Sequence, residues 1–212
     1  MDILKQIADS LQKGDDPRVG ALAAEALEKG IPAGDVLQDG LIAGMNVVGE
    51  QFRLREIFLP DVLLAARAMY AGLEILRPHL AQEGVPLRGK VVLGTIKGDL
   101  HDIGKNLVGI MLKGAGFEVI DLGHDVAPEA FVDAAVREEA SLIGMSALLT
   151  TTMTRMREVV DLVESRGLSG QIKTIVGGAP LSPDFAREIG ADDYASDGAT
   201  AVERVKALLG VT

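Results

Sequence analysis

Residues 90–104 read KVVLGTIKGDLHDIG and combine an apolar run, a polar loop and the start of an amphipathic pattern. The apolar run over 90–96 predicts a buried strand, whereas the spacing of Ile103, Leu107 and Ile110 predicts a helix. The stretch therefore predicts a strand, a loop and a helix in direct succession, which is the first half of a βαβ unit.

The same alternation is expected through the rest of the chain. Further apolar runs lie at 117–122, 142–148, 172–177 and, more weakly, near 192–195. The helices between and after them are expected at about 103–115, 128–139, 152–166, 182–189 and 198–209. This series predicts an α/β fold: a doubly wound, Rossmann-like parallel sheet of five strands with the flavodoxin-like order 2-1-3-4-5.

His101 is the residue of greatest chemical interest in the opening stretch. It follows the first strand, and open α/β sheets bind ligands at the carboxyl ends of their strands. Asp99 can accept a hydrogen bond from one ring nitrogen, which leaves the other nitrogen free to bind a metal. Gly98 and Gly104 lack side chains, so a large group could approach the backbone there.

The residues before this stretch have a different period. Residues 1 to about 85 show helical spacing throughout, and four helices with short links predict an N-terminal four-helix bundle. The segment 84–89 contains two glycines and a proline and is the expected linker. We therefore expect a helical domain over 1–86 and a Rossmann-like domain over 87–212.

Composition excludes several classes of function. The 212 residues carry a formal net charge of −10, which argues against a nucleic-acid or anionic-membrane surface. The chain has no cysteine, so disulfides, thiolate-bound zinc and cysteine-held iron–sulfur clusters are excluded. No apolar run approaches the roughly 18 residues of a membrane span, and no secretory signal is visible. A cytoplasmic protein with protein partners is expected.

Two further loops should join His101 at the same sheet edge. The third strand is followed by hydroxyl side chains that include Ser146, Thr150 and Thr152, and the fourth strand ends at Gly177-Gly178. Hydroxyls and paired glycines at one edge predict a narrow cleft for a flat or elongated ligand.

These motifs resemble the cobalamin-binding module of cobalamin-dependent methionine synthase and its relatives. The family pattern is Asp-x-His-x-x-Gly, then Ser-x-Leu, then Gly-Gly, and all three parts occur here in order. Gly104 and Ser146 are separated by 41 residues, and Leu148 and Gly177 by 28, which suits the family spacing.

The first half of the chain resembles the helical cap that precedes this module. The resemblance rests on the runs Asp39-Gly40-Leu41, 44–52, Phe58-Leu59-Pro60 and 65–69. It extends equally to the cap of free-standing corrinoid proteins in methanol, methylamine and methoxyaromatic methyltransferase systems.

The resemblance implies a role for each residue. His101 would be the lower axial cobalt ligand, and Asp99 and Thr152 would form a hydrogen-bond relay behind it that gains a proton as cobalt is reduced. Phe52 and Leu59 would cover the upper, methyl-bearing face. The remaining residues expected to contact cobalamin are Gly98, Asp102, Ile103, Gly104, Ser146, Leu148, Thr150, Gly177 and Gly178.

The function implied is that of a corrinoid protein cycling between cob(I)alamin and methylcobalamin. It would carry a methyl group from a substrate:corrinoid methyltransferase to a methylcorrinoid:tetrahydrofolate or coenzyme M methyltransferase, and a reductive activase would rescue oxidised cobalt. A hinge near 84–89 would move the cap aside. The methyl donor, the final acceptor and the status of such a carrier as an enzyme stay open.

Three other functions are compatible with parts of the pattern. The cobalamin-binding subunit of an adenosylcobalamin-dependent mutase shares the His101 motif. A cobalamin sensor is a second alternative, and a doubly wound protein that binds no corrin is a third. His124, on the loop after the second strand, is expected either at the cofactor rim or on the surface.

Overall fold

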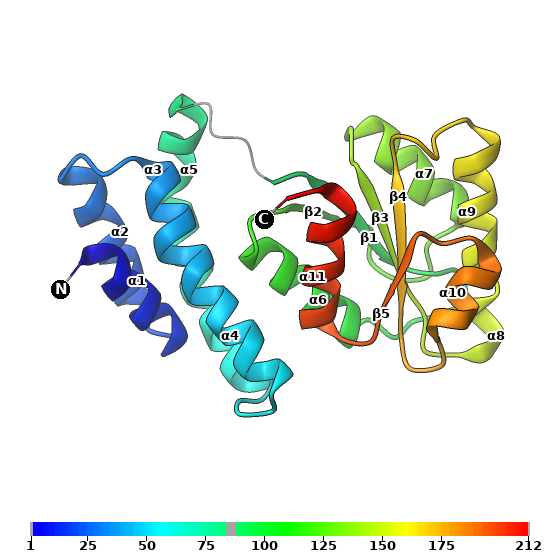
Figure 1. Cartoon of the computed structure of the whole chain (residues 1–212), viewed down its shortest axis with the longest axis horizontal. Coiled ribbons are helices and arrows are strands. Elements are labelled where there is room, and N and C mark those ends of the chain that lie inside the picture. Colours follow the sequence, from blue (N-terminus) through cyan, green and yellow to red (C-terminus); the bar gives the residue numbers. More distant parts are fainter. Residues whose placement is uncertain (1, 84–87, 212) are drawn as a thin grey trace. The chain divides into compact units, whose positions relative to one another are not determined.

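The computed structural model describes residues 2–83 and 88–211, which belong to two compact units. A helical unit precedes residue 84, and an α/β unit begins at Arg88 (Figure 1). The expected domain boundary at 86/87 lies outside the described residues, as does most of the expected linker and hinge over 84–89. Among the described helices, none is long and apolar enough to cross a membrane.

The helical unit confirms the helical character expected for the first part of the chain. Its elements are α1 (Ile3–Gln12), α2 (Asp16–Glu28), α3 (Ala33–Asp35), the π-helix η1 (Val36–Ile42), α4 (Ala43–Arg53) and α5 (Leu59–Glu83). Residues 33–53 therefore form one continuous helical run with a π-helical middle section. Gly40 lies in that section against α1, where an added Cβ would stand 3.2 Å from Cγ2 of Ile7.

Apolar periodicity and polar caps explain these helices. Asp2 and Asp15 accept hydrogen bonds from the first-turn N–H groups of Leu4 and Arg18, so both leading helices have side-chain N-caps. The apolar faces of α1, α2 and η1 are buried, with the largest fully enclosed side chains being Ile7, Leu11, Leu22, Leu37, Leu41 and Ile42.

The α/β unit confirms the predicted sheet. Five parallel strands have the order β2-β1-β3-β4-β5. The strands are β1 (Lys90–Thr95), β2 (Glu118–Asp121), β3 (Leu142–Ser146), β4 (Lys173–Gly177) and β5 (Asp193–Ala195). The helices are α6 (Ile103–Gly114), α7 (Pro128–Arg137), α8 (Thr150–Met153), α9 (Met156–Ser165), α10 (Pro183–Ile189) and α11 (Gly198–Leu209).

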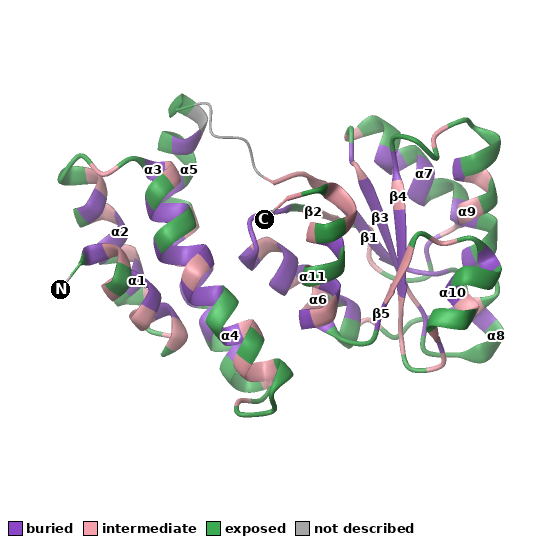
Figure 2. Cartoon of the chain, viewed as in Figure 1, coloured by how far each residue is buried: buried purple, intermediate pink, exposed green. Residues whose placement is uncertain are grey.

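Helices cover both faces of this sheet. Figure 1 shows α6 and α11 on one side and α7, α9 and α10 on the other. The central strands are buried along most of their length, as Figure 2 shows in purple. Phe131 of α7 is fully buried against β1, where Gly94 allows the approach because a Cβ there would lie 2.7 Å from the ring.

Two differences from the predicted elements bear on the site, and both lie after β3. The strand expected over 142–148 ends at Ser146. The helix expected over 152–166 is split into α8 and α9 around Thr154 and Arg155. The strand pattern breaks after Ala147 because the N–H groups of Leu148 and Leu149 bind a side chain instead of a neighbouring strand, as described below.

Candidate functional site

Strand register brings the expected loops together. Thr95 at the end of β1 pairs with Ser146 at the end of β3, and Ser146 pairs in turn with Gly177 at the end of β4. The loops that follow these three strands therefore leave the sheet side by side at its carboxyl edge.

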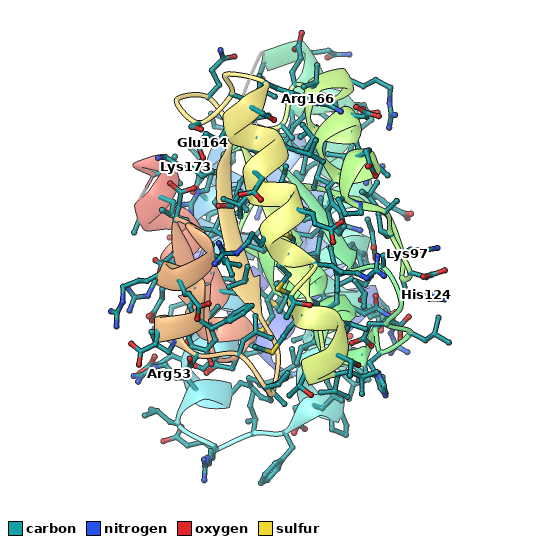
Figure 3. The ribbon with its side chains drawn as sticks, turned by 90° about the vertical axis from the view of Figure 1, so that its right-hand side faces the viewer. Arg53, Lys97, His124, Glu164, Arg166 and Lys173 are labelled. Carbon is teal, nitrogen blue, oxygen red and sulfur yellow. The ribbon has the colours of Figure 1, made fainter. Side chains whose placement is uncertain are left out.

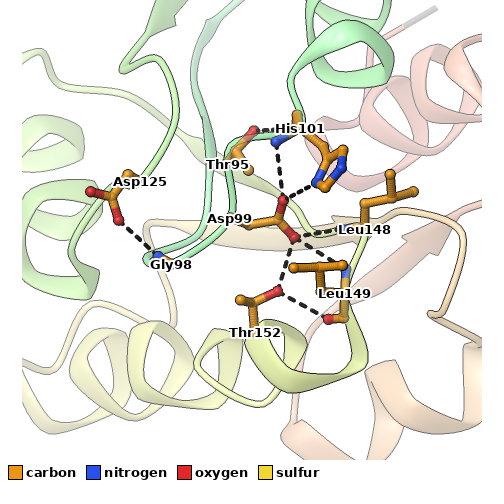
Figure 4. A network of polar contacts seen from close by, with 8 residues as sticks. All are labelled: Thr95, Gly98, Asp99, His101, Asp125, Leu148, Leu149 and Thr152. Carbon is orange, nitrogen blue, oxygen red and sulfur yellow. Dashed lines mark hydrogen bonds and ion pairs between the residues drawn. The ribbon is translucent and has the colours of Figure 1, made fainter.

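Asp99 is the centre of this edge and its side chain is completely buried. Its Oδ1 accepts hydrogen bonds from the backbone N–H of His101 at 3.0 Å and from the ring Nδ1 of His101 at 2.7 Å. Its Oδ2 accepts from the backbone N–H groups of Leu148 at 2.8 Å and Leu149 at 3.1 Å, and from Oγ1 of Thr152 at 2.9 Å (Figure 4). One carboxylate thus ties the loop after β1 to the loop after β3.

These contacts control the ionisation of Asp99. Burial alone raises the pKa of this carboxyl, but the N–H groups of His101 and Leu148, the imidazole and the Thr152 hydroxyl together lower the pKa far below its usual range. The side chain is therefore ionised at neutral pH. An ionised carboxylate can only accept hydrogen bonds, so Nδ1 of His101 carries the proton.

His101 is consequently oriented and accessible. With Nδ1 protonated, Nε2 of the neutral ring has a free lone pair. The side chain is 52% exposed, and its backbone carbonyl accepts a hydrogen bond from the buried Thr95 hydroxyl at 3.0 Å. The ring is held at one nitrogen and open at the other, which is the arrangement of a metal-binding histidine.

The surroundings of His101 fit a flat, largely apolar group that carries its own metal. Leu100 and Ile103 beside it are 66% and 75% exposed, and Leu148 and Leu149 of the facing loop are 44% and 41% exposed. Gly104 adds open space, since a Cβ there would meet nothing within 4 Å.

The donor set supports the same conclusion. Within residues 2–83 and 88–211, no group of three or more His, Cys, Asp or Glu side chains could hold a metal ion by itself. A single imidazole nitrogen suits a metal whose other positions are filled by a macrocycle, and cobalamin is such a group.

Packing of the protein backbone is sufficient to explain why glycine stands at positions 177 and 178. A Cβ on Gly178 would lie 1.8 Å from the carbonyl oxygen of Ala147, and the residue has φ +137°. A Cβ on Gly177 would lie 2.9 Å from the carbonyl oxygen of Ala195. The glycines thus allow close contact between adjacent backbone segments, and their expected contact with the nucleotide tail stays a prediction.

The remaining expected residues fall into two groups. Gly98, Asp102, Ser146 and Thr150 lie on the β1–α6 and β3–α8 loops or at their margins, so they share the edge with His101. Phe52 and Leu59 lie at the end of α4 and the start of α5 in the helical unit and are half-buried. Their expected role over the cofactor stays a prediction.

Asp125 is a residue of this edge that the sequence patterns did not single out. It lies on the loop after β2, and its Oδ1 accepts the backbone N–H of Gly98 at 2.8 Å (Figure 4). That bond, together with Lys97, lowers the pKa of the Asp125 carboxyl. Lys97 and the exposed His124 lie near one another at this margin (Figure 3). The only signal in the sequence that could have identified Asp125 is its place as a polar residue on the loop after a strand.

Comparison with known proteins identifies the family of each half of the chain. Residues 89–206 match the family described as B12 binding domain, and residues 3–77 match a second family with the same description. The fold and the site thus define a cobalamin-binding protein.

Full-length relatives narrow this class. A corrinoid protein of Desulfitobacterium hafniense is 42% identical over 99% of both chains. Trimethylamine corrinoid protein 1 of Methanosarcina mazei is 42% identical over 98% of this chain and 97% of its own. A chain in the crystal structure of the methanol:cobalamin methyltransferase complex of Methanosarcina barkeri matches with a TM-score of 0.87 and 32% identity, over 99% of this chain and 80% of its own. The chain belongs to the corrinoid protein family.

Proposed function

We propose that this protein is the methyl carrier of a corrinoid-dependent methyltransferase system and that His101 would bind the cobalt of its cobalamin. When bound, cobalamin supplies the cobalt that accepts and releases the methyl group. The observation that carries the proposal is the His101 ring, held at Nδ1 by a buried carboxylate and exposed at its other side.

Each residue of the network has a defined task in this proposal. Asp99 keeps the proton on Nδ1 and so presents the Nε2 lone pair to the metal. Thr152 donates to Asp99 and limits rotation of that carboxylate. The exposed side chains of Leu100, Leu148 and Leu149 would pack against the corrin and exclude water.

The names of the relatives support a proposal about the partners. One relative is named for trimethylamine, and a structural match comes from a methanol:cobalamin methyltransferase complex. We propose that this chain meets two methyltransferases, one specific for the methyl donor and one that passes the methyl group to tetrahydrofolate or coenzyme M. We also propose that a reductive activase serves this protein and that the protein is cytoplasmic. In the same proposal, residues 1–86 form a helical cap domain and residues 87–212 form the cobalamin-binding domain.

The test is anaerobic reconstitution with hydroxocobalamin, followed by absorption spectra of the wild type, His101→Ala and His124→Ala. His124 is an exposed histidine on the neighbouring loop and provides a matched control. We expect the wild type and His124→Ala to bind corrin with a histidine-ligated spectrum that His101→Ala loses.

Other outcomes contradict different parts of the proposal. A wild type that binds no corrin contradicts the carrier function. Corrin binding with the same spectrum in all three proteins contradicts the assignment of His101 only. Tighter binding of adenosylcobalamin than of methylcobalamin would favour the mutase alternative over the methyl carrier.

A further inference from the structure

The loop after β2 runs alongside the end of β1 and extends the sheet contacts beyond the strands. The N–H of Thr95 donates to the carbonyl of Gly123 at 2.9 Å, and the N–H of Val126 donates to the carbonyl of Thr95 at 3.0 Å. Ile96 and Val126 form a further parallel bridge. This loop is therefore fixed against β1 at the point where the chain turns towards His101.

Asp125 makes three contacts with the segment that leads to His101. Its carboxylate accepts the backbone N–H of Gly98 at 2.8 Å and Nζ of Lys97 at 3.0 Å. Its own N–H donates to the carbonyl of Asp99 at 3.0 Å. The backbone on both sides of the Gly98–Asp99 peptide bond is thus held by one residue of another loop.

The backbone conformations of Gly98 and Asp125 explain why the hydrogen bond between them affects the loop. Gly98 has φ +87°, a conformation that glycine adopts easily but does not prefer strongly over others. A hydrogen bond from outside the loop selects one of these conformations. Asp125 itself has φ +56°, a left-handed conformation that is unfavourable for most non-glycine residues and that aspartate and asparagine tolerate best.

The effect reaches His101 through Asp99. The Asp99 carboxylate can orient the imidazole only if its own backbone is in place, and Asp125 holds that backbone at the Asp99 carbonyl and at the preceding N–H. We propose that Asp125 is a positioning residue that fixes the loop of His101 and thereby favours coordination of its imidazole to cobalt. The inference rests on the function proposed above.

The ion pair with Lys97 is the weaker part of this arrangement. Both side chains are more than 40% exposed, and exposed ion pairs contribute little. The hydrogen bond to Gly98 acts on the backbone directly. Asp125→Asn keeps an acceptor oxygen and tolerates the same φ but has no charge, so it separates these two contributions.

The experiment measures ligation with cob(II)alamin bound to protein containing nitrogen-15 histidine. In the electron paramagnetic resonance spectrum, a histidine ligand then gives a doublet, whereas the cofactor's own base gives a triplet. The variants are Asp125→Ala, Asp125→Gly and Asp125→Asn. Asp133→Ala is the matched control because Asp133 is an exposed, ion-paired aspartate on α7.

We expect the ratio of histidine-ligated to unligated protein to fall about tenfold in Asp125→Ala and Asp125→Gly, as for other groups that orient metal ligands. Asp125→Asn and Asp133→Ala should stay within about twofold of the wild type. Asp125→Gly tolerates the positive φ, so loss of ligation in this variant cannot be assigned to backbone strain. Urea unfolding of the apo proteins identifies any variant that fails to fold.

Two results would overturn the inference. Unchanged ligation in Asp125→Ala and Asp125→Gly would show that the loop holds His101 without Asp125. An equal loss in Asp125→Asn would assign the effect to charge and not to the Gly98 hydrogen bond. A wild type that binds corrin without the histidine doublet contradicts the proposed role of His101. Either of the two results above, obtained with a wild type that shows the doublet, contradicts only the role of Asp125.

Discussion

The two units of the chain treat buried polar groups in opposite ways. Among the described residues, the buried polar or charged side chains are Thr95, Asp99, Lys105, Thr152 and Thr174, and all of them belong to the α/β unit. The enclosed side chains of the helical unit are apolar. One unit is therefore stabilised by packing, and the other also buries hydrogen-bonded groups, which are costly unless every partner is present.

The position of these groups shows what they are for. Thr95, Asp99 and Thr152 all contact the His101 loop or its carboxylate partner. Lys105 of α6 binds Asp121 at 2.5 and 2.6 Å, and Asp121 also accepts the N–H of Gly123, so this pair supports the neighbouring β2–α7 loop. Burial of polar groups is concentrated where loops must be held in one geometry.

The strongest test of this difference is Asp99→Ala. The variant leaves the partly buried N–H groups of His101, Leu148 and Leu149 without their acceptor. Each unsatisfied donor costs about 1–3 kcal/mol, so we expect a loss of about 3–5 kcal/mol in the free energy of unfolding, measured by urea denaturation, together with loss of histidine ligation. Asp133→Ala, at an exposed ion pair, should cost less than about 1 kcal/mol. Equal losses would contradict a special role for the buried carboxylate.

The pH dependence of stability follows from the same residue. The pKa of Asp99 is lower in the folded protein than its usual value, so its ionisation stabilises the fold. That contribution is complete above the unfolded pKa of about 3.9 and is lost as the pH falls below it towards the folded pKa. Acid titration of wild type and Asp99→Asn should show the steeper loss below about pH 4 in the wild type.

A backbone contact at the same edge provides the next test. Gly178→Ala would place a Cβ 1.8 Å from the carbonyl oxygen of Ala147, and we expect a loss of about 3 kcal/mol or more. Gly123→Ala is the matched control because Gly123 has a positive φ with nothing within 4 Å of the added Cβ. It should cost only about 1 kcal/mol. If both variants lose a similar free energy of unfolding, the positive φ of Gly178 requires glycine there, and the close approach of Ala147 does not.

A substitution that creates a cavity in the helical unit tests whether that unit is stabilised by apolar packing alone. Leu22 of α2 is 2% exposed, and Leu22→Ala should lower the free energy of unfolding by about 3 kcal/mol. The cobalt ligation of the folded variant should match the wild type because no polar partner of His101 is changed. A shifted resonance spectrum would contradict this separation of stability from ligation.

The smallest expected effect is at Thr152. Thr152→Val removes the hydroxyl that donates to Asp99 at 2.9 Å while keeping the shape of the side chain. We expect a loss of about 1 kcal/mol and a lower fraction of histidine-ligated cobalt. Thr152→Ser keeps the hydroxyl and should retain ligation. If Thr152→Val and Thr152→Ser have the same ligated fraction, the hydroxyl has no part in orienting the ring.

The sequence by itself determined the class of fold and the contact between Asp99 and His101 at the candidate site. Alternation of apolar runs with helical periods is a local property, and it predicted the five strands and their order. The spacing of Asp99 and His101 is equally local, so their hydrogen bond could be anticipated from a two-residue separation.

The tertiary structure decided the contacts between loops. The strand expected to reach Leu148 stops at Ser146 because the N–H of Leu148 binds a carboxylate 49 residues away. The contact of Asp125 with Gly98 spans 27 residues and depends on where β2 lies beside β1. Periodicity records the environment of each residue along its own element, whereas such contacts exist only after the sheet has placed distant strand ends side by side.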